Sequence, residues 1–139
     1  MLTRCYDADQ INAVVNHPDV RPHIGALELG DLDLSDAVAR PEHWFLMGEH
    51  GGFMFSWSAP DVREVHTFVL PSGRGQWSKA ARQFAIDYAK EHGVKMLWTK
   101  IREQDHNVIH YAQQGGMQFT GDVIETFGEP YRIYRMELS

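Results

Sequence analysis

One segment near the middle of the chain restricts the fold more than any other. An apolar run at residues 62–70 ends at Pro71, passes through the loop Ser72-Gly73-Arg74-Gly75, and enters a long amphipathic helix. Apolar residues in this helix recur at the spacing of one continuous buried stripe: Trp77, Ala80, Ala81, Phe84, Ala85, Tyr88 and Ala89. Gly93 is a natural helix stop, and residues 94–101 follow as a strand. This strand–helix–strand unit predicts one right-handed parallel crossover.

The rest of the chain predicts antiparallel strands and short helices around that unit. Strands are expected at residues 2–6, 44–48, 53–57, 119–127 and 131–138, with a turn at residues 50–52. Asp7 and Gln10 form a capping box for a first helix that Pro18 ends, and Asp105 can cap a helix that ends at Gly115. Residues 19–40 lack one clean period, so we expect a short helix and an irregular crossing there. The predicted fold class is α/β with a mixed, mostly antiparallel sheet, one parallel pair and about four flanking helices.

Length and charge limit the classes of function that are open to the chain. Its 139 residues fit a single domain, residues 1–139, that buries a real core. A net charge of −6 argues against a nucleic-acid partner, which needs a basic face. No stretch is apolar enough to span a bilayer, and the N-terminus has no apolar signal region. With one cysteine, Cys5, no internal disulfide can form, so we expect a cytoplasmic protein without membrane or nucleic-acid partners.

The loop before the long helix has the properties of an anion site. Backbone N–H groups at a helix N-terminus are free, and the helix dipole places partial positive charge there. Arg74 adds a permanent cation, and glycines allow close approach of a ligand to the backbone. These residues fit an ordinary strand-to-helix turn equally well, in which the glycines serve only the backbone geometry and no anion binds.

The loop resembles the coenzyme A pyrophosphate loop of the GNAT superfamily of acyltransferases. The matching pattern is Val69-x-Pro71-x-x-Arg74-Gly75 between an apolar strand and a long helix, although Trp77 and Lys79 replace the small residues of the family pattern. The resemblance implies a GNAT fold and acetyl-CoA as cosubstrate. It also implies a set of coenzyme-binding residues: Phe68, Val69 and Leu70 on the strand, Gly73, Arg74, Gly75, Gln76, Trp77, Ser78 and Lys79 at the loop, and Asn107 before the second helix.

The same resemblance implies acyl transfer to an amine by direct attack on a thioester held between two parallel strands. Such a reaction needs a base for the amine, and Glu64 and His66 share one face of the strand at residues 62–70. Histidine is the side chain best suited to proton transfer near neutral pH, so His66 is the preferred base and Glu64 the second candidate. Tyr111 is the candidate acid for the leaving thiolate, although family members carry their tyrosine at the position of Ala112.

A narrower likeness points to small GNAT-like proteins of tailed bacteriophages. It depends on three short segments: Asn16-His17-Pro18, His66-Thr67 and Ser72-Gly73. Two functions therefore stay open: an N-acyltransferase with an amine acceptor of unknown identity, and a catalytically degenerate binding or virion-assembly protein of the same fold. For a phage protein, we expect the host cytoplasm or the virion as its location, with a virion partner or a homodimer as its assembly.

The eight histidines raise the question of a metal site. His106 and His110 are four residues apart on a predicted helix, but no third ligand, cysteine pair or His-Glu-x-x-His motif accompanies them. We therefore expect no metal.

Overall fold

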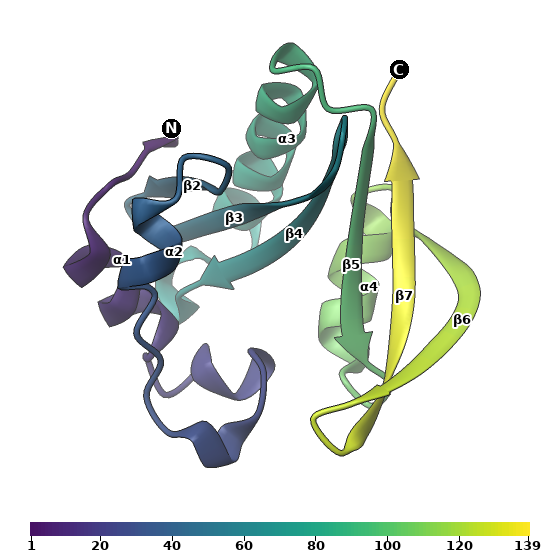
Figure 1. Ribbon diagram of the computed structural model, residues 1–139, viewed down its shortest axis with the longest axis horizontal. Coiled ribbons are helices and arrows are strands. Elements are labelled where there is room, and N and C mark those ends of the chain that lie inside the picture. The colour runs from purple at the N-terminus through teal and green to yellow at the C-terminus, as the bar shows by residue number, and fades with distance from the viewer.

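A single seven-stranded sheet organises the chain in the computed structural model, which describes residues 1–139. Its spatial order is β1-β2-β3-β4-β5-β7-β6, and only the β4–β5 pair is parallel (Figure 1). The strands are β1 (Thr3–Arg4), β2 (Trp44–Gly48), β3 (Gly51–Ala59), β4 (Val62–Val69), β5 (Met96–Arg102), β6 (Gln118–Thr126) and β7 (Glu129–Glu137). The predicted fold class is confirmed: a mixed α/β fold with one parallel pair and four α-helices.

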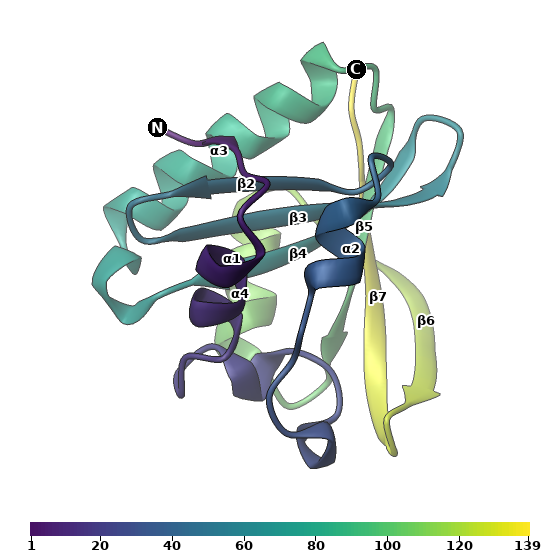
Figure 2. The ribbon, with the colours of Figure 1, turned by 60° about the vertical axis from the view of Figure 1, so that its left-hand side comes forward.

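The helices lie on both faces of the sheet, as the two views in Figures 1 and 2 show. Helices α3 (Gln76–Glu91) and α4 (His106–Gln114) cover one face, and α1 (Ala8–Val15) and α2 (Ser35–Ala39) cover the other. Short 3-10 turns occur at Arg21–His23, Leu27–Leu29 and Pro71–Gly73. None of the helices combines the length and the apolar character needed to cross a membrane.

Two apolar cores form because successive strand residues point to opposite faces. The core beneath α3 and α4 includes Phe53, Phe55, Ala81, Ala85, Ala89 and Leu97. The core beneath α1 and α2 includes Ile11, Val15, Phe45, Met47 and Phe68. On α3 the buried face is narrower than the predicted stripe, because Ala80 and Phe84 are exposed and Ser78 is buried. The small side chains on this face bring the helix close to the sheet.

The parallel pair is joined along only part of its length. Residues 62, 63 and 64 of β4 pair with residues 96, 97 and 98 of β5, and no pairing follows. Beyond Glu64 the two strands diverge, and Figure 1 shows the gap widening toward the C-terminal ends of both strands. The backbone groups of β4 that face this gap therefore have no neighbouring strand.

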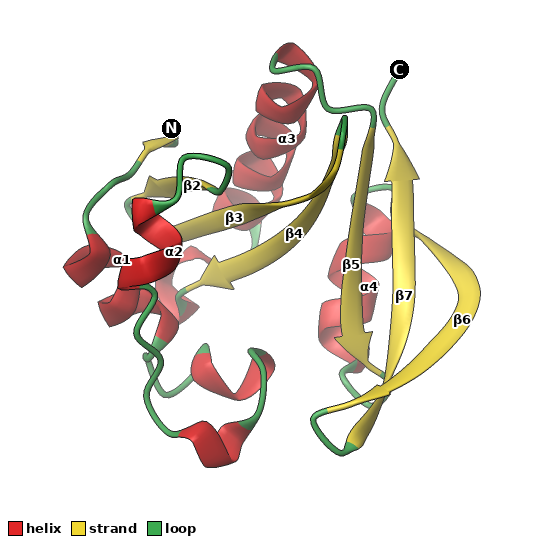
Figure 3. Cartoon of the chain, viewed as in Figure 1, coloured by secondary structure: helices red, strands yellow, loops and turns green.

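The loop regions differ from the sequence predictions in three places. Residues 19–40 contain two 3-10 turns and the short helix α2, drawn in red in Figure 3, rather than one helix and a crossing. Gly51 and Gly52 belong to β3, so the turn before β3 lies at residues 49–50. Asp105 is the residue before α4, but its carboxylate makes no capping hydrogen bond and instead lies 3.1 Å from Nδ1 of His23.

Candidate active site

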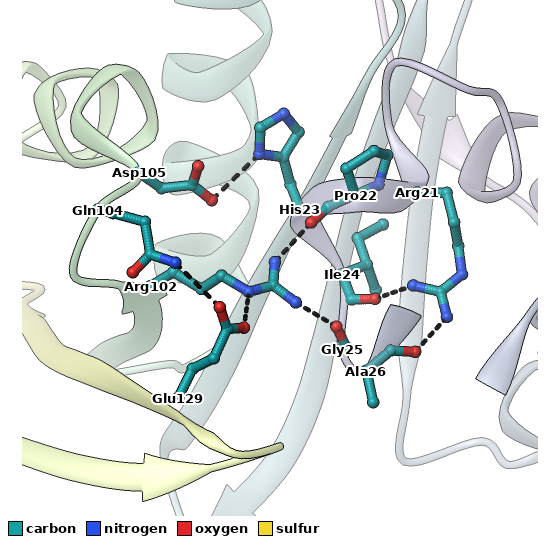
Figure 4. A network of polar contacts seen from close by, with 10 residues as sticks. All are labelled: Arg21, Pro22, His23, Ile24, Gly25, Ala26, Arg102, Gln104, Asp105 and Glu129. Atoms are coloured by element: carbon teal, nitrogen blue, oxygen red, sulfur yellow. Dashed lines mark hydrogen bonds and ion pairs between the residues drawn. The ribbon is translucent and has the colours of Figure 1, made fainter. Parts of the chain in front are cut away.

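A cleft of about 680 Å³ occupies the gap between β4 and β5. Residues of α3 and α4 line it on one face of the sheet, and residues of the segment before α2 line it on the other. We call residues 21–30 of that segment the strap, because the buried Arg102 of β5 ties it across the wide end of the gap (Figure 4). The buried Arg21 holds the strap together internally. The cleft therefore passes between the strands and opens toward both faces.

The strap is fixed by carbonyl oxygens that accept from arginine. Arg21 donates within the strap to the carbonyls of Ile24, Ala26 and Gly30. Arg102 of β5 donates to the carbonyls of Pro22 and Gly25, and its Nε lies 2.7 Å from Oε2 of Glu129. Every guanidinium nitrogen of Arg102 is thus in use, which ties the strap to the far side of the cleft.

The cleft concentrates positive charge in an acidic protein. Of the 13 lysines and arginines, five line it, against two of the 19 acidic residues. The five cations are Arg74, Lys79, Arg82, Lys100 and Arg102, and the two carboxylates are Asp19 and Asp105. This reversal of charge makes the cleft an attractive environment for an anion.

The N-terminus of α3 opens into the cleft with free backbone donors. Lys79 makes the first intrahelical bond, to the carbonyl of Gly75 at 3.2 Å, and the N–H groups of residues 75–78 have no protein partner. Gly75 has a φ of +98° and open space where a Cβ would be. Glycine suits this conformation, and the free amides with the helix dipole form an anion site. The N–H groups of Gly73 and Arg74, in contrast, bond to the carbonyls of Leu70 and Pro71.

Trp77 does not block this helix end. Its ring packs edge-on against His50 with 5.1 Å between the ring centroids, and it does not line the cleft. A Cβ on Gly73 would lie 2.4 Å from the Cβ of His50 and 2.8 Å from the Trp77 ring, so this glycine makes room for the two rings. Gln76 is exposed and also lies outside the cleft lining. Of the predicted loop residues, Arg74, Gly75, Ser78 and Lys79 line the cleft, whereas Gly73, Gln76 and Trp77 do not.

The backbone of β4 explains which of its residues can bind a ligand. The N–H of Leu70 donates to the carbonyl of His50 at 2.9 Å, so Leu70 cannot offer it to a ligand, contrary to expectation. Backbone groups alternate in direction along a strand, so those of Phe68 also face β3, and those of Thr67 and Val69 face the gap. The side chain of Phe68 is buried in the core beneath α1. Val69 and Thr67 are therefore the residues that can present main-chain groups to the cleft.

Glu64, His66 and Lys100 form a polar group where β4 and β5 separate. Nζ of Lys100 lies 2.8 Å from Oε2 of Glu64, and Nε2 of His66 lies 3.6 Å from Oε1. Burial of Glu64 favours the neutral acid, but hydrogen bonds and charge from His66 and Lys100 outweigh it and lower the pKa of Glu64 to about 2. So acidic a carboxyl group is a weak base. His66 and Lys100 line the cleft, whereas Glu64 lies behind them.

Tyr111 and Asn107 line the cleft from α4. The Tyr111 hydroxyl donates to the carbonyl of Ser78 at 2.8 Å, and burial raises the pKa of Tyr111 to about 12. Arg82 lies over the Tyr111 ring and donates to the Tyr111 carbonyl at 2.8 Å. These contacts join α4 to the first turns of α3.

Three cations of the cleft were missed in the sequence. Arg82 is three residues after Lys79, a spacing that places both on one side of a helix. Lys100 and Arg102 alternate with apolar residues along β5, which indicates a shared face, but their position at the gap depends on pairing that sequence does not reveal. The structure contains no group of three or more side chains suited to hold a metal ion.

The fold is similar to that of known acetyltransferases. One similar structure is a ribosomal-protein-alanine N-acetyltransferase from Brucella melitensis, with a TM-score of 0.76, 17% identity and coverage of 99% of each chain. A candidate acetyltransferase from Salmonella typhimurium, solved with its cofactor acetyl-CoA, has a TM-score of 0.75 and 17% identity over 100% of this chain and 95% of its own.

A third similar structure is a variant of the spermidine N-acetyltransferase SpeG from Vibrio cholerae. Its TM-score is 0.75, with 9% identity over 99% of this chain and 92% of its own. No family model and no curated protein sequence matches the chain. At these identities the likeness shows the fold, which is that of the GNAT acetyltransferases.

Proposed function

We propose that the protein is a GNAT N-acetyltransferase that binds acetyl-CoA in the cleft between β4 and β5 and acetylates an amine. The observation that carries this proposal is the position of the free N-terminus of α3. This helix end borders the cleft that gathers five of the chain's cations, because Gly75 and Ser78 line that cleft. The N–H groups of residues 75–78 have no partner within the protein.

The residues present fit coenzyme A. A diphosphate carries negative charge and several acceptor oxygens, which suit the amides of residues 75–78 together with Arg74 and Lys79. Thr67 and Val69 would bind the amide-containing arm of the coenzyme through the main-chain groups that face the gap, as an added strand does. Asn107 and Ser78 line the same side of the cleft.

Bound acetyl-CoA would supply a thioester carbonyl that a neutral amine attacks, with release of the thiolate. His66 reaches the cleft from the opposite side of the sheet and can take the proton of the amine, because 31% of its side chain is exposed. Glu64 stays ionised and orients His66. The N–H groups of β4 that face the gap stabilise negative charge on the carbonyl oxygen.

A thermal-shift titration with acetyl-CoA and with CoA tests the proposal. A ligand at about 100 times its Kd stabilises the folded state by roughly 2.7 kcal/mol, so the melting temperature should rise with both ligands. Titration of free thiol during incubation with amines then reports transfer. A melting temperature that does not respond to either ligand would remove the coenzyme site and the activity with it.

The second candidate is a catalytically inactive protein of this fold, for instance one that acts in virion assembly. The engaged hydroxyl of Tyr111 favours it, because this group is the candidate acid of the reaction and already donates to Ser78. Stabilisation by CoA without thiol release across a broad set of amines would select this candidate over the enzyme.

A further inference from the structure

The half of the cleft between β4 and the strap differs in chemistry from the half at α3. Its apolar wall consists of Val20 and Ile24 on one side and Phe127 and Tyr131 on the other. Phe127 packs edge-on against Tyr131 with 6.0 Å between the ring centroids, and Tyr131 is paired with Arg102 on the neighbouring strand. An acceptor that enters from this side therefore meets aliphatic and aromatic surface before it reaches His66.

This half holds few negative groups that a polycation could use. Asp105 is already 3.1 Å from His23, and Asp19 lies at the rim with 60% of its side chain exposed. The acidic residues of the segment before α2, Glu28, Asp31 and Asp33, do not line the cleft. A bound polyamine needs several carboxylates at its own charge spacing, and this half offers only Asp19 at the rim and Asp105, which is already paired with His23.

The cations of this half are already paired with carboxylates. Nζ of Lys100 lies 2.8 Å from Glu64, and this pairing leaves the part of the cleft beside His66 close to neutral. Arg102 is paired in the same way with Glu129. Because neither carboxylate is free to bind an ammonium group, this half favours an amine that binds in its neutral form.

The strap borders the acceptor half of the cleft. Arg102 of β5 binds the carbonyls of Pro22 and Gly25, as the close view in Figure 4 shows, so the strap is tied to β5. The contact between His23 and Asp105 adds a second tie beside it. An acceptor beside His66 therefore shares this half with a segment that the protein holds in place, which favours a compact molecule over a long chain.

One polar group in this half has no partner within the protein. The hydroxyl of Tyr131 is buried and unpaired, in a side chain only 4% exposed. A buried hydroxyl without a hydrogen bond is costly, and a ligand that supplies the missing partner removes this cost. Burial raises the pKa of Tyr131, so the hydroxyl keeps its proton and can donate it.

From these features we infer that the acceptor is a small primary amine on an apolar, aromatic body, bound between Phe127, Tyr131 and Ile24, rather than a polyamine or a peptide. This inference rests on the proposed acetyltransferase function and adds the class of its substrate.

The test compares four acceptors with acetyl-CoA at saturation: 2-phenylethylamine, ethylamine, spermidine and a short peptide that begins with alanine. We expect kcat/KM for 2-phenylethylamine to exceed that of each of the others at least tenfold. Phe127→Ala should remove most of the preference for 2-phenylethylamine over ethylamine. Phe119→Ala is the matched control, because Phe119 is a similarly exposed phenylalanine on β6 outside the cleft, and it should leave the preference unchanged.

The outcomes separate this inference from the proposed function. If acetyl-CoA does not raise the melting temperature, both fail together. If acetyl-CoA binds but spermidine or the peptide is acetylated with a kcat/KM equal to that of 2-phenylethylamine, the acceptor class is wrong and the coenzyme site stands. The same conclusion follows if no amine is acetylated and calorimetry detects no binding of 2-phenylethylamine to the CoA complex. If Phe127→Ala kept the preference for 2-phenylethylamine over ethylamine, Phe127 would not contact the acceptor and the inferred acceptor site would be wrong.

Discussion

The two halves of the cleft use charge in opposite ways. At the N-terminus of α3, Arg74, Lys79 and Arg82 face the cleft without a carboxylate partner, and four backbone amides are free. On the other side of the sheet, Lys100 pairs with Glu64, Arg102 with Glu129, and His23 with Asp105. We call the half at α3 the unpaired half, because its cations are free to bind an anionic ligand. We call the half on the other side of the sheet the paired half, because its ion pairs leave little net charge.

The proposed function requires one acidic chain to bind two unlike ligands in one cleft, and this difference in charge suits that requirement. The net charge of −6 would repel an anion from an average surface, so the anion site has to be assembled locally. In the paired half, each cation has a carboxylate partner, so this half carries little net charge. Its charged groups can orient neighbouring side chains, as Glu64 orients His66. Substitutions at His66, Glu64, Arg74 and Tyr111 test the two halves separately.

His66→Ala should have the largest effect, because it removes the base from the paired half. We expect kcat at neutral pH to fall by on the order of 100-fold or more, with little change in the affinity for CoA. Steady-state kinetics and a CoA titration measure the two quantities. His110→Ala serves as control, since His110 is exposed on α4 outside the cleft. An undiminished kcat in His66→Ala would assign the proton transfer to another group.

Glu64 should make stability depend on pH in the acid range. Its pKa is about 2 in the folded protein, against an ordinary value of 4.5, so the folded state binds this proton less tightly than the unfolded state. The stabilisation is complete above pH 4.5 and is lost as the pH falls through 2, by about 3 kcal/mol in the free energy of unfolding.

Urea denaturation at several pH values, for the wild type and for Glu64→Gln, measures this effect. The wild type should lose stability more steeply than Glu64→Gln between pH 4.5 and pH 2. Glu137→Gln, which alters an exposed carboxylate at the end of β7, should follow the wild type. If the free energy of unfolding depended on pH equally in the wild type and in Glu64→Gln, the pairing of Glu64 with Lys100 and His66 would contribute nothing to stability.

Arg74→Glu reverses a charge in the unpaired half. We expect CoA to bind about 30-fold more weakly or worse, because a charge-assisted contact is lost and a repulsion is gained. The fold should be spared, since the side chain is exposed and bonds only to the carbonyl of Asp19. Arg135→Glu changes the net charge equally outside the cleft and should retain affinity. If calorimetry found the same affinity for CoA in the wild type and in Arg74→Glu, the phosphates of CoA would bind away from Arg74.

Tyr111→Phe should have the smallest effect. Its hydroxyl is already bonded to Ser78, so the change should cost about 1 kcal/mol of stability and alter kcat little. A thermal melt and an initial-rate assay measure both. A large fall in kcat with unchanged stability would make Tyr111 the acid of the reaction. The unpaired half would then take part in the chemical step as well as in binding.

Local features were predicted well because they depend on neighbouring residues. Asp7 caps α1 by accepting from the N–H groups of Asp9 and Gln10, which confirms the cap. The reciprocal half of the capping box is absent, because the side-chain oxygen of Gln10 accepts from the thiol of Cys5. The helix after the Arg74 loop, the parallel pair and the closing strands β6 and β7 also follow from periodicity and turn chemistry. Each of these signals lies within a short stretch of sequence.

The site was predicted less completely because it depends on contacts across the chain. The strap has no periodicity, and its place is set by Arg102, about 80 residues away, which no local pattern reveals. The orientation of Trp77 was also open, since the helical stripe does not show which side packs against His50. The divergence of β4 and β5 is a property of the sheet as a whole.

That divergence has a mechanical consequence. Only three rungs join the half of the sheet that ends in β4 to the half that begins with β5, and the rest of the seam is open. A molecule bound in the seam contacts both halves of the sheet at once, because β4 lines the cleft from one side and β5 from the other. We expect such a molecule to add to the three residue pairs that hold β4 beside β5, and so to resist separation of the two halves.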